Sequence, residues 1–238
     1  MVGDKLNPFD NRERSNTLFQ DPVVFAIPLF IASLLLIITA GYILRQRGQE
    51  PRARIGVAAL LGGAIWMTGY GLEMVCPGLA LKFLCKKIRY LGIAVVPTAW
   101  LLYTLYYSGR DKWAAFPRSL LFWIIPFITV LLAWTNEFHG WVWVQSEVTP
   151  ENQPPFFRFP EGPWLLPFTI YSYGQVLAGG VIILASLAGY LRIYRRHIYV
   201  ILFSALLVAG TRLLDQLDFL PFSHPDLEPY AFVLISLL

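Results

Sequence analysis

The chain has 238 residues, of which 56% are hydrophobic, 16% aromatic and 14% charged, and its formal net charge at pH 7 is +4. Soluble domains carry about 25% charged residues, so this composition excludes a disordered chain and a disulfide-rich miniprotein and argues against an ordinary soluble enzyme. The mean hydropathy of +0.55 comes from long apolar runs, and we therefore interpret the basic balance as membrane topology rather than nucleic-acid binding.

A polar segment of mixed charge, residues 1–22, precedes the first apolar run and is expected to form an extracytoplasmic tail. A transmembrane helix needs about 20 mostly apolar residues. Six runs reach that length: 23–44, 55–75, 88–108, 117–136, 164–190 and 198–217. A seventh, 229–238, is still apolar at the last residue and covers only about 15 Å as a helix.

We therefore predict an all-α, polytopic membrane helix bundle. Residues 23–238 form one domain of seven transmembrane helices, and the seventh is truncated at the C-terminus. The alternative is a protein of six membrane helices followed by a short terminal helix.

Basic residues in the connectors predict the orientation. Three alternating connectors, 45–54, 110–118 and 192–196, are rich in arginine and lysine and are expected on the cytoplasmic side. This places the N-terminus outside the plasma membrane and the C-terminus in the cytoplasm. One connector disagrees, because its basic residues then lie on the outer side: Lys82, Lys86, Lys87 and Arg89.

Small residues and prolines within the predicted helices bear on packing. Gly62 and Gly63 predict a close approach between the second helix and a neighbour. Pro97 and Pro126 permit kinks in the third and fourth helices. Such residues are common in membrane helices and indicate packing rather than chemistry.

No nucleotide-binding, protease or kinase signature occurs in the sequence. His139, His197 and His224 lie in three separate connectors, without metal-ligand neighbours at helical spacing. We therefore predict no metal site, no cofactor and no catalytic site in this chain. A retinal Schiff base is also disfavoured, because it requires a lysine in the last helix and no lysine follows Lys112.

The two cysteines, Cys76 and Cys85, flank the connector between the second and third predicted helices, on the predicted outer side. A disulfide is chemically feasible in an oxidising compartment. The spacing does not fix the distance between the two Cα atoms. Two free thiols are the alternative.

Charged residues inside membrane helices are rare and usually functional. Arg212 and Asp215 share one face of the sixth predicted helix because they are three residues apart, and Glu73 lies near the outer end of the second. The candidate ligand or sensor residues are those expected on the same side of the membrane: Glu73, Arg89, Tyr90, Thr135, Asn136, His139, Arg212 and Asp215. We interpret them as an outward-facing polar pocket. The alternative is a structural ion pair of Arg212 with Asp215, with Glu73 reaching to the interface.

Four stretches carry a family resemblance: 64–83, 87–110, 124–143 and 224–238. The most specific are KIRYLGIAVVPTAWLLYTLYYSGR, with its Tyr-Leu-Gly, Pro and Trp, and IIPFITVLLAWTNEFHGWVW, with its Thr-Asn-x-x-His. Together they resemble the N-terminal seven-transmembrane region of histidine kinases. The residues at motif positions are Glu73, Tyr90, Gly92, Pro97, Thr135, Asn136 and His139. The family's Thr-Pro before helix seven is Glu228-Pro229 here, which leaves any role of that threonine unsupported in this chain.

The resemblance implies a sensory input domain joined, at the cytoplasmic end of helix seven, to an output module in cis. That module is most often a histidine kinase and in some relatives a diguanylate cyclase. The full-length protein is then expected to be an enzyme that acts as a homodimer. The other expected partners are the lipid bilayer and an unknown small ligand.

The alternative function is a small transporter or channel that uses Glu73, Arg212 and Asp215 as its site. Two observations stand against it. No internal repeat is visible, and the three charges lie in one half of the membrane rather than at its midplane.

Overall fold

The described part of the chain comprises residues 22–144 and 160–187, together with Gly210, Pro229 and Tyr230, in a computed structural model. Its elements are α2 (Pro22–Arg47), α3 (Pro51–Val75), α4 (Leu79–Tyr107), α5 (Asp111–Ala114), α6 (Leu120–Trp134), the 3-10 turn η1 (Asn136–Phe138) and α7 (Leu165–Leu187). Across these ranges there is no strand, and Trp143 and Glu161 form one isolated antiparallel bridge. The prediction of an all-α fold is confirmed for this part of the chain.

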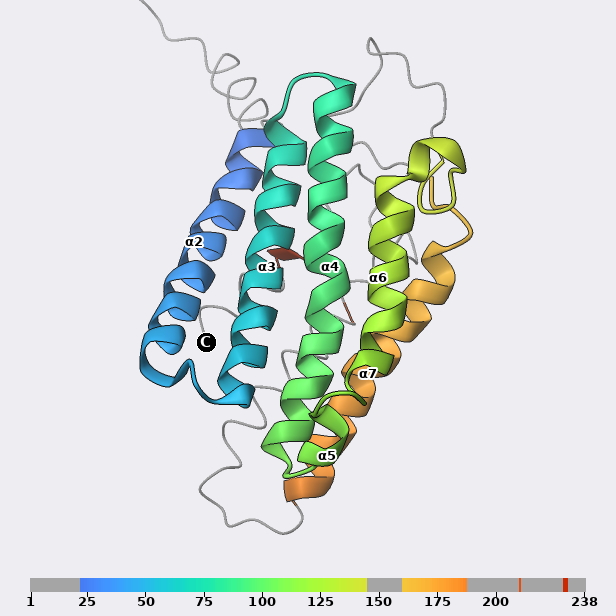
Figure 1. Cartoon of the computed structure of the whole chain (residues 1–238). Coiled ribbons are helices and arrows are strands. Elements are labelled where there is room, and N and C mark those ends of the chain that lie inside the picture. Colours follow the sequence, from blue (N-terminus) through green and yellow to red (C-terminus); the bar gives the residue numbers. More distant parts are fainter. Residues whose placement is uncertain (1–21, 145–159, 188–209, 211–228, 231–238) are drawn as a thin grey trace, which may run out of the picture.

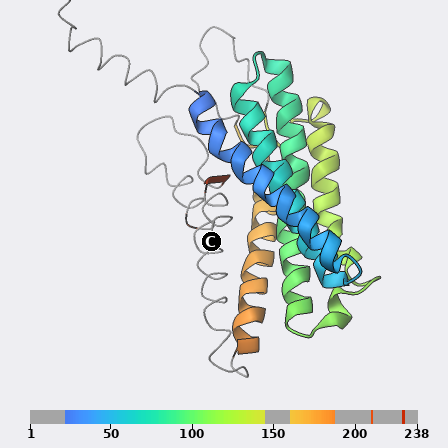
Figure 2. The ribbon, with the colours of Figure 1, turned by 90° about the vertical axis from the view of Figure 1, so that its left-hand side faces the viewer.

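The long helices run alternately up and down, with α4 at the centre of the described bundle (Figure 1). α4 packs against α3, α6 and α7, and α3 also packs against α2. Figure 2 views the bundle from the side of α2, which is inclined to the other helices. This arrangement puts the turn between α3 and α4 at the same end of the bundle as η1, and the turn between α2 and α3 at the opposite end.

Among the residues that the structure describes, four helices are long and apolar enough to cross a membrane, namely α2, α3, α4 and α7, and α6 is a shorter apolar helix. In α2 one face is buried through Leu29 and Ala32, while Ile31 and Leu34 are more than half exposed. Large apolar side chains exposed along a whole helix face are expected to contact lipid rather than water. The chain is therefore a multi-pass membrane protein. The expected sixth and seventh spans lie almost wholly outside the described residues, so seven spans remain a prediction.

α3 and α4 approach each other closely at glycines. A Cβ atom on Gly92 would lie 2.3 Å from the carbonyl oxygen of Gly62 and 2.5 Å from the backbone nitrogen of Trp66. A Cβ atom on Gly69 would lie 2.9 Å from the backbone of Arg89. Only glycine fits at these positions, because the obstructing atoms belong to the neighbouring backbone. The expected role of Gly62 as a packing residue agrees with this geometry.

Two helix boundaries differ from those expected. α4 begins at Leu79, well before the expected residue 88, so the basic residues assigned to a connector lie on its first turns. Apolarity alone placed the boundary too late, because residues such as Lys82 and Lys86 interrupt the apolar run without opposing the helix. The fourth expected span, 117–136, is shorter in the structure, since α6 starts at Leu120, after Pro117, and ends at Trp134.

Candidate functional site

An ion pair joins α3 and α4 near the turn between them. The Nη1 atom of Arg89 lies 3.2 Å from the Oε2 atom of Glu73. Only 11% of the Arg89 side chain and 12% of the Glu73 side chain are exposed. Gly69 is one helical turn before Glu73, and its missing side chain lets the α4 backbone at Arg89 come close enough for the pair to form. Burying two charges is costly, so this pair is a stronger functional candidate than an exposed one.

The guanidinium of Arg89 also lies over an aromatic ring. Its Cζ atom is 5.0 Å from the centre of the Tyr70 ring, a cation–π distance. Tyr70 belongs to a buried cluster with Leu29, Met67 and Met74, against which Tyr230 packs. The Tyr230 hydroxyl donates a hydrogen bond to the carbonyl oxygen of Phe25, 3.0 Å away. The ion pair is thus continuous, through packed aromatic side chains, with α2 and with the start of the expected seventh helix.

A second cluster surrounds Trp143, whose side chain is fully buried. The ammonium of Lys86 lies 5.0 Å from the centre of its ring. The Tyr90 and Phe83 rings lie 5.5 Å and 6.5 Å from it, centre to centre. Lys86 is buried to 5% exposure, and the aromatic ring faces it with the negative side of its quadrupole. Tyr90, expected as a sensor residue, is therefore part of an aromatic cluster between α4 and the segment after η1.

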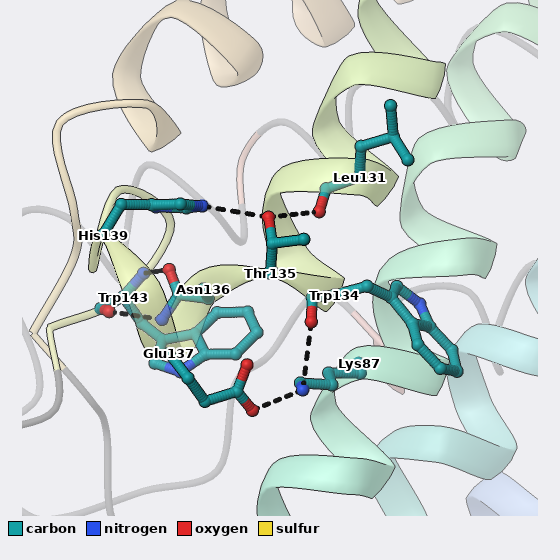
Figure 3. A network of polar contacts seen from close by, with 8 residues as sticks. All are labelled: Lys87, Leu131, Trp134, Thr135, Asn136, Glu137, His139 and Trp143. Atoms are coloured by element: carbon teal, nitrogen blue, oxygen red, sulfur yellow. Dashed lines mark hydrogen bonds and ion pairs between the residues drawn. The ribbon is translucent and has the colours of Figure 1, made fainter.

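Asn136 holds that segment in place (Figure 3). Its Oδ1 atom accepts hydrogen bonds from the backbone N–H groups of Val142, at 2.9 Å, and Trp143, at 3.3 Å. Its Nδ2 atom donates to the carbonyl oxygen of Trp143 at 2.8 Å. Asn136 is 1% exposed, so its amide replaces water for three backbone groups that would otherwise be buried without partners. Its role in the structure is to position Trp143.

Thr135 and His139 form a neighbouring hydrogen-bond chain (Figure 3). The backbone N–H of Trp141 donates to Nδ1 of His139 at 3.0 Å. A neutral imidazole that accepts at Nδ1 carries its proton on Nε2, which therefore donates to Oγ1 of Thr135, 3.1 Å away. The Thr135 hydroxyl in turn donates to the carbonyl oxygen of Leu131 at 2.8 Å. These successive hydrogen bonds fix the end of α6 to the turn that follows.

Lys87 and Glu137 form a second ion pair at the same end, between α4 and η1. The Lys87 ammonium also donates to the carbonyl oxygen of Trp134 at 3.2 Å. The hydrogen bond from Lys87 holds the pKa of the Glu137 carboxyl below its usual value. The sequence did not single out Glu137, and its signal was weak, because a lone glutamate beside a predicted helix end has no distinctive spacing.

Cys76 and Cys85 lie next to the Glu73–Arg89 pair. Both are free, and their Sγ atoms are 3.6 Å apart. Cys85 is buried, whereas Cys76 is half-buried at the end of α3. We call this part of the bundle, which contains the α3–α4 turn, the Glu73–Arg89 pair and η1, the cysteine end.

The opposite end of the bundle, which we call the arginine end, carries exposed cations. It contains the α2–α3 turn, the C-terminal end of α4 and α5 (Figure 1). Its basic residues in the described ranges are Arg45, Arg47, Arg52, Arg54, Arg110, Lys112 and Arg118. Arg52 pairs with Glu50, Nε to Oε2, at 2.6 Å, and its hydrogen bond lowers the pKa of the Glu50 carboxyl. Tyr42, Arg47, Arg52 and Tyr103 help to line an open groove of about 410 Å³ at this end.

A polar network inside the bundle was not predicted from the sequence. Pro126 has no N–H, so the carbonyl of Phe122 lacks its helical donor. The Tyr171 hydroxyl donates to that carbonyl at 2.8 Å, and the Thr98 hydroxyl lies 3.2 Å from it. Gln175 contacts both Tyr171, at 2.9 Å, and Thr98, at 3.0 Å. The network links α4, α6 and α7, and the signal for it was a glutamine within an apolar span.

The structure thus brings together some of the expected site residues and separates others. Glu73 pairs with Arg89, and Tyr90 meets Asn136 through Trp143. Thr135 and His139 contact each other. Arg212 and Asp215 lie outside the described residues, so their expected pairing stays a prediction. Among the residues that the structure describes, no group of three or more His, Cys, Asp or Glu side chains is placed to hold a metal ion.

Comparison with protein families gives one match. The family of the N-terminal 7TM region of histidine kinase matches residues 28–238, which is most of the chain. Neither curated proteins nor solved structures give a match for this chain.

Proposed function

The chain belongs to the family of the N-terminal 7TM region of histidine kinase, and on that premise we propose that it detects a signal at the cysteine end and relays it to a cytoplasmic output module. The membrane-spanning helices and the family support a membrane sensory input domain. In the proposal the output module is a histidine kinase joined in cis after helix seven, and the full-length protein acts as a dimer.

The buried Glu73–Arg89 pair is the observation that carries this proposal. A buried ion pair contributes little net stability, because its desolvation offsets its attraction. Its energy is nevertheless sensitive to any ligand or proton that changes the charge of one partner. A small ligand with an ionisable group near Glu73 would therefore shift the balance between two packings of α3 against α4.

The relay proceeds through packed side chains. Tyr70 lies under Arg89 and belongs to the buried cluster that Tyr230 covers. Tyr230 lies at the start of the run expected to form helix seven. A change in the position of Arg89 is thus transmitted through Tyr70 to that helix, and helix seven connects to the output module.

The orientation in this proposal places the cysteine end outside the cell. The exposed cations of the arginine end support it, because cytoplasmic connectors carry an excess of arginine and lysine. The short basic run at the start of α4 does not indicate a cytoplasmic connector, because it lies on a helix and not in a loop. Lys86 and Arg89 are buried on the helix, where Trp143, Tyr70 and Glu73 contact them.

The test uses the full-length protein in membrane vesicles and measures autophosphorylation with labelled ATP. The double variant Glu73→Gln/Arg89→Gln removes both charges and keeps a polar side chain at each position. We expect its basal autophosphorylation to differ from that of the wild type by about fivefold or more. A factor of about five corresponds to the lower end of typical coupling free energies.

The matched control is Lys87→Gln/Glu137→Gln, which removes the other ion pair of the cysteine end. Its autophosphorylation should stay close to that of the wild type, because 44% of the Glu137 side chain is exposed and solvent screens this pair more than the buried one. Unchanged autophosphorylation in the Glu73/Arg89 variant, present in the membrane at the normal level, would contradict the proposal.

A further inference from the structure

The two cysteines stand directly beyond the ion pair on the same faces of α3 and α4. Cys76 is three residues after Glu73 and caps the C-terminal end of α3. Cys85 is four residues before Arg89, one helical turn away on α4. The sulfur contact at 3.6 Å and the ion pair at 3.2 Å are therefore successive links between the same two helices.

The turn between the cysteines is short, and its tip is exposed. It consists of Pro77 and Gly78, and Gly78 has a φ of +84°, a conformation that glycine adopts without strain. The two thiols thus face each other across a tight reversal of the chain. Residues 1–238 contain no other cysteine, so within this part of the chain each thiol has a single thiol partner.

We propose that Cys76 and Cys85 form a reversible disulfide that covalently links α3 to α4 at the cysteine end. Sulfur atoms in a disulfide are about 2 Å apart. The two sulfur atoms, 3.6 Å apart as free thiols, therefore have to move closer together for the bond to form, and Cys76 is the less buried of the two. The bond itself does not depend on the proposed sensory function. Its effect on signalling does, and the two are tested separately below.

The oxidant in this proposal is an external disulfide, either a small molecule or a protein. The Cys76 thiolate attacks one sulfur of that disulfide, forms a mixed disulfide and releases the first external thiol. The Cys85 thiolate then attacks the Cys76 sulfur and displaces the second external thiol. The chain loses two protons and two electrons, and the external disulfide gains them as two thiols. Cys76 reacts first because it is the more exposed of the two.

The first experiment maps the thiols. The protein in membrane vesicles is equilibrated with mixtures of oxidised and reduced glutathione, alkylated with a maleimide and analysed by peptide mass spectrometry. In the oxidised mixtures we expect the peptides with Cys76 and Cys85 to be linked, unalkylated and lighter by two hydrogen atoms. In the reduced mixtures both thiols should be alkylated.

Two single variants separate the steps. In Cys85→Ser, the exchange should stop at a glutathione adduct on Cys76. In Cys76→Ser, the buried Cys85 should resist the adduct and remain a thiol. If both wild-type thiols stay free in the most oxidising mixture, or if the linked product joins two chains instead of one, the proposal is overturned.

The second experiment measures autophosphorylation of the full-length protein after oxidation and after reduction. The disulfide restrains α3 and α4 beside the Glu73–Arg89 pair, so the oxidised and reduced proteins should differ in autophosphorylation. The autophosphorylation of the variant Cys76→Ser/Cys85→Ser should respond to neither treatment. If the disulfide forms and autophosphorylation is unchanged, the disulfide stands and its coupling to the proposed sensory function fails.

Discussion

The two ends of the bundle each hold an arginine–glutamate pair, and the shorter pair is the less informative one. At the arginine end, Arg52 and Glu50 approach to 2.6 Å, but 63% and 39% of their side chains are exposed. At the cysteine end, Arg89 and Glu73 are 3.2 Å apart and almost fully enclosed. Water and salt screen the exposed pair of Arg52 and Glu50. In the buried pair, Arg89 and Glu73 are largely removed from water, so each charge depends on the opposite charge for its stabilisation. Burial, more than distance, therefore decides which pair is sensitive to a signal.

The largest expected effect comes from breaking the buried pair. Arg89→Ala leaves the Glu73 carboxylate buried without its cation, which should lower the free energy of unfolding by about 3–5 kcal/mol. Thermal unfolding in detergent micelles, followed by circular dichroism, measures the loss. Arg52→Ala is the matched control at the arginine end and should unfold as the wild type does. Equal losses of unfolding free energy in the two variants would contradict the conclusion that burial distinguishes the pair at the cysteine end from the pair at the arginine end.

An intermediate effect is expected from the amide that holds the turn at the cysteine end. Asn136→Ala leaves the N–H groups of Val142 and Trp143 and the carbonyl of Trp143 without their partner. The free energy of unfolding should fall by roughly 2 kcal/mol, the cost of leaving buried polar groups unpaired. Tryptophan fluorescence reports the release of Trp143 as increased access to an aqueous quencher.

The control for this variant is Gln49→Ala, which removes an exposed amide from the turn at the arginine end. The Gln49 side chain contacts Arg54 at 3.3 Å in an exposed position, where water replaces the lost bond. A fluorescence change as large as that of Asn136→Ala would show that burial does not govern the effect.

The smallest effect is a pH dependence from the Lys87–Glu137 pair. Lys87 lowers the pKa of Glu137 in the folded protein, so the folded state binds fewer protons than the unfolded state around that pH. The contribution is complete above the unfolded pKa of about 4.3 and disappears as the pH falls through the folded value. Because Glu137 is 44% exposed, the contribution should be only a few tenths of a kcal/mol.

Unfolding curves of the wild type and of Glu137→Gln between neutral and acidic pH measure this contribution. The difference between the two proteins should shrink on acidification. Glu50→Gln is the corresponding change at the arginine end, where the pKa is lowered in the same way. If the difference for Glu137→Gln grows as the pH falls, the folded protein raises the pKa of Glu137 and the expected direction is wrong.

Much of the fold could be read from the sequence because membrane helices are encoded locally. The apolar runs predicted α2, α3 and α7 within a few residues over the described part of the chain. The prediction was less accurate at the start of α4, where lysines interrupt the apolarity, although the helix continues through them. Apolarity and helix formation are separate properties, and only the second determines where a helix begins.

By itself, the sequence determined that this is a multi-pass membrane protein of the histidine kinase 7TM family, and it singled out Glu73, Arg89 and Asn136 as candidates. Only the tertiary structure decided what these residues contact. Glu73 meets Arg89, and Asn136 holds the segment that carries Trp143. The reason is that such contacts depend on how each helix is rotated and how closely it packs. Those quantities are set by distant residues, such as Gly69 beside Arg89, and no spacing along one helix encodes them.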